Sequence, residues 1–121
     1  MILAFKEQFI TPIIKLQKIH TIREDKHDRW EAGKTIHAAT GVRTPRYFNF
    51  AKFPCVSTQK ISMINNDFGK AVWIDNVKLT RHGIEQLAKN DGFPSSKEFW
   101  EWFSEEYYTN HKLIHWTDFK Y

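Results

Sequence analysis

A chain of 121 residues is long enough to bury one hydrophobic core and too short for two, so we expect a single domain over residues 1–121. The sequence is 41% hydrophobic and 26% charged, which is typical of soluble globular proteins, and no apolar run is long enough to cross a membrane. The single cysteine, Cys55, excludes an internal disulfide and fits a reducing, cytoplasmic setting. The opening residues reach Glu7 too soon to form a secretory signal.

Positive charge is concentrated in the first half of the chain. Residues 1–60 carry 11 Lys or Arg against 5 Asp or Glu, whereas residues 61–121 carry 7 against 9, for a net charge of +4. A basic half beside an acidic half indicates a polyanionic partner such as nucleic acid.

Hydrophobic periodicity predicts many short strands and few helices. The expected strands cover residues 3–6, 19–23, 35–40, 55–64, 69–79 and 112–119. The expected helices cover residues 7–16, a stretch from Thr80 to a stop at Gly92, and residues 96–107. This order predicts an α+β domain built on a small, partly open β-barrel with flanking helices.

Several residues set the expected ends of these elements. Pro12 either begins the first helix or kinks it, and Gly92 is suited to a left-handed C-terminal stop of the second. The pair Ser95 and Glu98 forms a capping box for the third helix. Asp75–Asn76 is expected to bend or bulge the strand over residues 69–79.

The most unusual stretch is Lys18-Ile19-His20-Thr21-Ile22-Arg23-Glu24-Asp25. A strand with only a structural role would rarely combine Lys, His, Thr and Arg, so we expect Lys18, Thr21 and Arg23 to line a cleft for an anionic ligand. The alternative is an edge strand with a solvated face. Lys18 and Thr21 are three residues apart and fall on opposite faces of a regular strand. To reach the same cleft, Lys18 has to lie in the turn before the strand.

One carboxylate, Asp91, falls at the C-terminal end of the second expected helix. The carbonyl end of a helix is an unfavourable place for a negative charge, which suits a carboxyl group that acts as a base or a proton shuttle. The alternative is an ordinary helix-ending Asn-Asp-Gly turn.

Two loops carry further candidate binding residues. Arg43 and Arg46 precede the aromatic run Tyr47–Phe50, a combination that suits phosphate contact with base stacking. The alternative is the end of a hairpin whose rings face the core. Trp30 is the only large apolar residue in the polar loop over residues 24–34.

Metal and cofactor sites are not indicated. There is no His-Glu-x-x-His motif, no pair of cysteines and no glycine-rich phosphate loop. His111 and His115 are four residues apart but straddle the start of a predicted strand, so they need not converge. We therefore expect no metal and no cofactor.

Four features extend over nearly the whole chain: the run Lys18-x-x-Thr21-Ile22-Arg23, a turn at Gly33, the segment Ala88-x-x-Asp91-Gly92-Phe93, and a closing strand through Asp118-Phe119-Lys120. Together they resemble an ASCH domain. The resemblance implies a PUA-like β-barrel and a link to RNA binding.

A small bacterial branch of that family hydrolyses acetylated cytidine with a lysine, a threonine and a glutamate. At matching positions the resemblance assigns these roles to Lys18, Thr21 and Asp91, of which Asp91 is one methylene shorter than the glutamate. The loops over residues 24–34 and 41–54 are also longer than in those compact hydrolases.

Two functions from different classes follow. As a binding module, the domain holds RNA or a nucleotide with Arg23, Arg43 and Arg46 on phosphate and Trp30 on a base, while Thr21 and Asp91 contact the base edge. As an amidohydrolase, it deacylates an N-acylated cytidine-type nucleoside.

In the amidohydrolase, Lys18 takes a proton from Thr21 or water, Asp91 passes a proton to the leaving amine, and Arg23 or a backbone amide stabilises the oxyanion. A third hypothesis is that the protein is a scaffold whose cleft is vestigial. The sequence leaves both the choice and the oligomeric state open.

Overall fold

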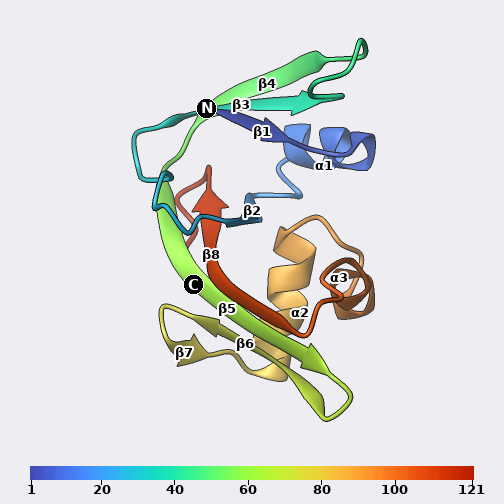
Figure 1. Cartoon of the computed structure of the whole chain (residues 1–121), viewed down its shortest axis with the longest axis vertical. Helices are drawn as coiled ribbons and strands as arrows, with labels where there is room; N and C mark the ends of the chain where they lie inside the picture. The colour runs from blue at the N-terminus through green and yellow to red at the C-terminus, as the bar shows by residue number, and fades with distance from the viewer.

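The computed structural model covers residues 1–121 and has an α+β architecture with two β-sheets and three α-helices (Figure 1). The smaller sheet has the strand order β1-β3-β4. It contains β1 (Ile2–Ala4), β3 (Thr35–Thr40) and β4 (Phe48–Pro54), with β1 parallel and β4 antiparallel to β3.

The larger sheet is antiparallel and has the order β2-β8-β5-β6-β7. Its strands are β2 (His20–Glu24), β5 (Ser57–Asn66), β6 (Gly69–Ile74), β7 (Val77–Lys78) and β8 (Tyr107–His115). The two sheets do not close into one hydrogen-bonded barrel. Instead β1 and β2, each at the edge of its own sheet, come together through a hydrogen bond from the Arg23 guanidinium to the carbonyl of Ala4.

The helical segments flank the sheets. A 3-10 turn, η1 (Glu7–Phe9), leads into α1 (Ile10–Ile14), which lies beside β1 (Figure 1). The helices α2 (Arg81–Asn90) and α3 (Ser96–Trp102) contact each other and cover one side of the larger sheet. None of the helices is long and apolar enough to span a membrane.

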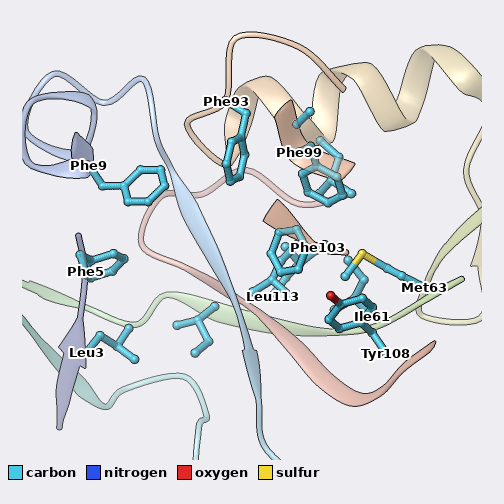
Figure 2. Close-up of a cluster of buried hydrophobic side chains, with 14 of the residues drawn as sticks. Leu3, Phe5, Phe9, Ile61, Met63, Phe93, Phe99, Phe103, Tyr108 and Leu113 are labelled. Carbon is cyan, nitrogen blue, oxygen red and sulfur yellow. The ribbon is translucent and has the colours of Figure 1, made fainter. Parts of the chain in front are cut away.

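Aromatic rings fill much of the core between the helices and the sheets. Phe93 contacts Phe9 and Phe99 edge to face, with ring centroids 5.7 and 5.8 Å apart, and Phe99 lies 4.8 Å from Phe103 (Figure 2). Burying a ring of this size stabilises the fold by about 1.5–3 kcal/mol. One continuous cluster of buried residues extends from Leu3 in the smaller sheet to the helices.

Much of the sheet follows the predicted pattern. The strand over residues 35–40 matches β3, and the hairpin of β5 and β6 turns between Asn66 and Gly69. The strand predicted over residues 69–79 is divided in two. Asp75 and Asn76 both adopt left-handed φ values, 50° and 67°, and form a tight turn between β6 and β7 rather than a bulge.

Two helix predictions and one strand prediction were wrong in extent. The first helix is divided into η1 and α1 and ends at Ile14. α1 begins at Ile10, so Pro12 neither begins nor breaks the helix but lies in its first turn, where a missing N–H costs no helical hydrogen bond. The third helix ends at Trp102 instead of residue 107, because Tyr107 and Tyr108 pair with Ile64 and Met63 of β5. Tyr and Thr favour strands, so β8 already begins at Tyr107. It ends at His115, and the strand predicted over residues 112–119 therefore differs from β8 at both ends.

The predicted capping box is also only partly formed. The Ser95 hydroxyl contacts the Glu98 carboxylate but caps no backbone N–H of α3. The backbone N–H of Ser96 instead donates to the Glu85 carboxylate of α2, at 3.2 Å from each oxygen. This contact fixes α3 against α2.

Gly92 ends α2 in the predicted left-handed conformation, with φ of +94°. A Cβ atom there would lie 3.2 Å from Cβ and Cδ of Lys18 and 3.3 Å from Cδ1 of Phe9. Gly33 has the same φ of +94° but nothing within 4 Å of its Cβ position, so it is a matched control.

We expect Gly33→Ala to lower the free energy of unfolding by about 1–2 kcal/mol, the cost of left-handed strain. Gly92→Ala should lose at least about 1 kcal/mol more, because the added methyl group displaces Lys18 and Phe9. Urea unfolding measures both variants, and equal losses would contradict the close approach at Gly92.

Candidate functional site

A cavity of about 410 Å³ opens where the edge strands β1 and β2 approach η1 and the C-terminal ends of α2 and α3. It is lined by Ala4, Phe5, Lys6, Phe9, Lys18, Thr21, Ile22, Arg23, Asp91, Phe93, Trp102 and Phe103. The predicted residues Lys18, Thr21, Arg23 and Asp91 therefore lie around one space.

The turn after α1 brings Lys18 into the cavity. The backbone N–H groups of Gln17 and Lys18 both donate to the carbonyl of Pro12, at 2.8 and 3.0 Å, and Ile19 then donates to the carbonyl of Asn90 at 2.9 Å. Lys18 therefore lies in the turn before β2 and shares the cavity with Thr21, which is the placement that strand alternation required.

Lys18 forms a buried ion pair with Asp91. Its Nζ donates to the Asp91 carbonyl at 2.8 Å and to Oδ1 of the same residue at 3.0 Å, and both side chains are only 3% exposed. Asp91 is the C-terminal cap residue of α2, so the ammonium group offsets both the carboxylate and the negative end of the helix. Burial lowers the pKa of Lys18, and the Asp91 carboxylate opposes part of that shift.

The Asp91 carboxylate has one saturated oxygen and one free oxygen. Oδ1 accepts hydrogen bonds from two side chains, from Nζ of Lys18 and from Nδ1 of His20 at 3.1 Å. Oδ2 has no hydrogen-bond partner within the protein, and Asp91 lines the cavity. The site therefore offers a carboxylate oxygen to a ligand that donates a hydrogen bond.

Arg23 and Thr21 form the second polar pair. Nε of Arg23 donates to the Thr21 hydroxyl at 3.2 Å, and the guanidinium lies 4.8 Å from the centroid of the Phe5 ring. No hydrogen bond joins Lys18 to Thr21, since the lysine donates to Asp91 and the threonine accepts from Arg23. Burial lowers the pKa of Arg23, and Asp91 opposes that shift.

Aromatic rings wall the rest of the cavity. Phe5, Phe9, Phe93 and Phe103 surround the space between β1 and the helices (Figure 2). Trp102 is 43% exposed and packs its ring against Phe9 and Phe93, with centroids 5.4 and 5.7 Å away. An indole that is half in contact and half open can stack on a planar ligand. Trp102 is not among the candidates from the sequence, because a ring at helical spacing from Phe99 and Phe103 is typical of a core residue.

Three of the predicted binding residues lie outside the cavity. Trp30 is in the hydrophobic core, only 6% exposed, because the Asp25 carboxylate accepts from the backbone N–H groups of Arg29 and Trp30 and folds the loop inward. Arg43 and Arg46 are exposed in the loop between β3 and β4 and do not line the cavity. The structure therefore does not bring these three side chains to the mouth of the cleft.

Behind Asp91 lies a buried polar layer that the sequence did not indicate. His20 is fully buried, and its Nε2 is 2.7 Å from the hydroxyl of Tyr121. These residues are 101 positions apart, so no local spacing connects them. The one sequence signal was that His20 belongs to the unusual stretch that begins at Lys18.

A second, polar hollow of about 380 Å³ surrounds Lys112 on the larger sheet. Lys112 is already paired with Asp25 and Asp28, and it also donates to the carbonyl of Trp30. These contacts hold the loop over residues 24–34 in place. Nowhere do three or more His, Cys, Asp or Glu side chains come together in a way that could hold a metal ion.

Comparison with models of protein families, with curated proteins and with solved structures found no match to this chain. Inference about function therefore depends on the residues of the site.

The lowered pKa of His115, which pairs with His20 across β8 and β2, makes the stability of the fold depend on pH. Burial first, and then the neighbouring His20 and Lys120, lower its pKa to about 4, and Asp75 opposes this shift. An unfolded histidine has a pKa of about 6.5. As pH falls from 6.5 to 4, the unfolded chain takes up a proton that the folded chain does not, so stability falls through this window and levels off below it.

We expect the free energy of unfolding to fall with pH in this window by up to about 1.4 kcal/mol per pH unit for this histidine. His115→Gln, which keeps a donor for the Gln59 side chain, should reduce the slope and leave the part due to buried His20. Exposed His82→Gln is the control and should keep the original slope. An unchanged slope in His115→Gln would contradict the assignment.

Proposed function

We propose that this chain is an ASCH-like domain with a PUA-like, partly open barrel, and that its cavity binds a nucleotide or nucleoside, free or within RNA. The observation that carries the proposal is the cavity of about 410 Å³ with aromatic walls and a buried polar floor. Ligand sites of this kind are mostly apolar, with a few polar groups that fix orientation.

The polar groups suit the edge of a base. Oδ2 of Asp91 is free to accept from an amino group, and the hydroxyl of Thr21 and the remaining N–H of Lys18 can donate to a carbonyl or ring nitrogen. The exposed face of Trp102 offers a stacking surface in place of the predicted Trp30. Stacking with hydrogen bonds to a base edge is how proteins recognise unpaired nucleotides.

The cationic groups suit a phosphate at the rim. Arg23 uses Nε and one terminal nitrogen on the protein, which leaves its other terminal nitrogen available, and exposed Lys6 lines the same cavity. Arg43 and Arg46 are outside the cavity, so their predicted phosphate contacts apply only to a longer RNA that reaches the loop between β3 and β4.

The barrel assignment also rests on this region. In a partly open barrel two edge strands approach without forming a ladder, and the Arg23 contact with Ala4 is a bridge of that kind between β1 and β2.

Calorimetric titration with the four ribonucleoside monophosphates and a short single-stranded RNA tests the binding function. Trp102→Ala should weaken binding by about 1–3 kcal/mol, and Trp102→Phe should retain most of the affinity. Tyr47→Ala, which removes a similarly exposed ring outside the cavity, should leave mononucleotide binding unchanged. Failure of the unaltered protein to bind any of these probes would reject the proposal.

Hydrolysis of an N-acylated cytidine-type nucleoside is the second candidate, favoured by the lowered pKa of Lys18 beside Thr21 and Asp91. In that reaction neutral Lys18 takes a proton from water or from the Thr21 hydroxyl as the oxygen of that group attacks the acyl carbon, and Arg23 or a backbone amide stabilises the oxyanion. Lys18 returns this proton through Asp91 to the leaving amine as the C–N bond breaks. Attack by water releases the carboxylic acid directly, whereas attack by Thr21 leaves an acyl ester that a water molecule then hydrolyses. The missing Lys18–Thr21 hydrogen bond favours binding over this reaction.

Single-turnover incubation with N4-acetylcytidine distinguishes the two functions. Deacylation that is lost in both Thr21→Ala and Lys18→Met, with folding checked by circular dichroism, would establish the amidohydrolase. We expect binding without turnover, because Lys18 is held by Asp91 and not by the threonine.

A further inference from the structure

A chain of hydrogen bonds extends from Asp91 away from the cavity. Nδ1 of His20 lies 3.1 Å from Oδ1 of Asp91, and Nε2 of the same ring lies 2.7 Å from the Tyr121 hydroxyl. The side-chain amide of Asn90 donates to that hydroxyl at 3.0 Å. All these groups lie behind the carboxylate, and none of these three residues lines the cavity.

The direction of every proton in this chain can be assigned. The Asp91 carboxylate can only accept, so Nδ1 of His20 carries the ring proton and donates it to Oδ1. Nε2 of the neutral ring is then an acceptor and takes the proton of the Tyr121 hydroxyl. The hydroxyl oxygen in turn accepts from the Asn90 amide, whose own oxygen accepts from Gln86 at 2.9 Å.

Both ring residues are neutral in this arrangement. Burial lowers the pKa of His20, with Asp91 opposing and Lys18 reinforcing the shift. Burial also raises the pKa of the Tyr121 hydroxyl well above its usual value. A proton passed along the chain would leave a buried tyrosinate, so the chain holds groups in place and does not conduct protons away.

Tyr121 is itself fixed from behind. Its backbone N–H donates to the Gln59 side chain at 2.9 Å, and the Gln59 amide donates back to the Tyr121 carbonyl at 3.0 Å. Gln59 is in turn held by Asp75 at 2.9 Å. The Tyr121 hydroxyl therefore has a defined position relative to β2.

We propose that His20 and Tyr121 are positioning residues for Asp91, fixing the orientation of its carboxylate so that one oxygen stays unpaired for a ligand. Lys18 and His20 both donate to the same oxygen, Oδ1, so turning the carboxylate out of this orientation breaks two hydrogen bonds. The second oxygen, Oδ2, thus remains available as an acceptor in a residue that lines the cavity. The inference rests on the proposed function, because the oriented oxygen matters only if the cavity binds a ligand that donates to it.

Two measurements on the intact chain test the proposal. The ¹⁵N resonances of His20 report its tautomer and the hydrogen bond at Nε2 without any ligand. Affinities for cytidine and uridine monophosphate then report Asp91, because only cytosine presents an amino group to Oδ2. Tyr121→Phe removes one hydroxyl, and Tyr108→Phe is the matched control, since the buried Tyr108 hydroxyl accepts from the backbone N–H of Glu105.

In the unaltered protein we expect the Nδ1-protonated tautomer of His20. In Tyr121→Phe the Nε2 resonance should move toward that of an imine nitrogen without a hydrogen bond, and the preference for cytidine over uridine monophosphate should fall roughly three- to tenfold. Tyr108→Phe should change neither. His20→Asn, whose amide can replace Nδ1 as donor, should retain more of the preference than His20→Leu.

An Nε2-protonated His20 in the unaltered protein would overturn the proposal. So would a Tyr121→Phe variant whose His20 resonances and nucleotide preference match those of Tyr108→Phe. If the unaltered protein binds neither nucleotide, the proposed function fails, and the ¹⁵N measurement alone decides whether His20 and Tyr121 hold Asp91.

Discussion

The buried ion pair between Lys18 and Asp91 is the interaction on which the site depends. It joins the turn before β2 to the end of α2, across 73 positions of sequence. Withdrawing both charges from water is costly unless each is hydrogen-bonded, and here Lys18 donates twice while Oδ1 of Asp91 accepts twice. Removing one partner leaves the other charge buried and uncompensated, which costs about 3–5 kcal/mol in comparable pairs.

The cavity exists because the two sheets meet at edges rather than through a ladder. The side of β2 that faces away from β8 has no neighbouring strand, and β1 is likewise the edge of the smaller sheet. The space between them is closed by rings from η1, α3 and the segment after α2, and by the Arg23 side chain. An open sheet edge is normally a liability, and here it is covered by groups that also line the cavity.

Local chemistry predicted part of this site, and long-range packing decided the rest. The stretch from Lys18 to Arg23 and the Asp91–Gly92 helix end could be predicted because each combines unusual residue types over a few positions. The choice between Trp30 and Trp102 could not, since it depends on which ring the folded loops leave exposed. His20 and Tyr121 meet only through the fold, and the final strand began earlier than predicted because its pairing with β5 outweighed the helical pattern.

The ion pair also bears on what the site can do. A general base has to reach the proton it removes. Nζ of Lys18 instead donates to two oxygens of Asp91 and makes no hydrogen bond with Thr21. Freeing it for catalysis breaks contacts that also hold β2 against α2. Recognition needs no such change, because Asp91, with its unpaired Oδ2, and Trp102 already line the cavity before a ligand enters. A preorganised site avoids the cost of ordering its groups on binding, so the contacts that stabilise this fold favour binding over turnover.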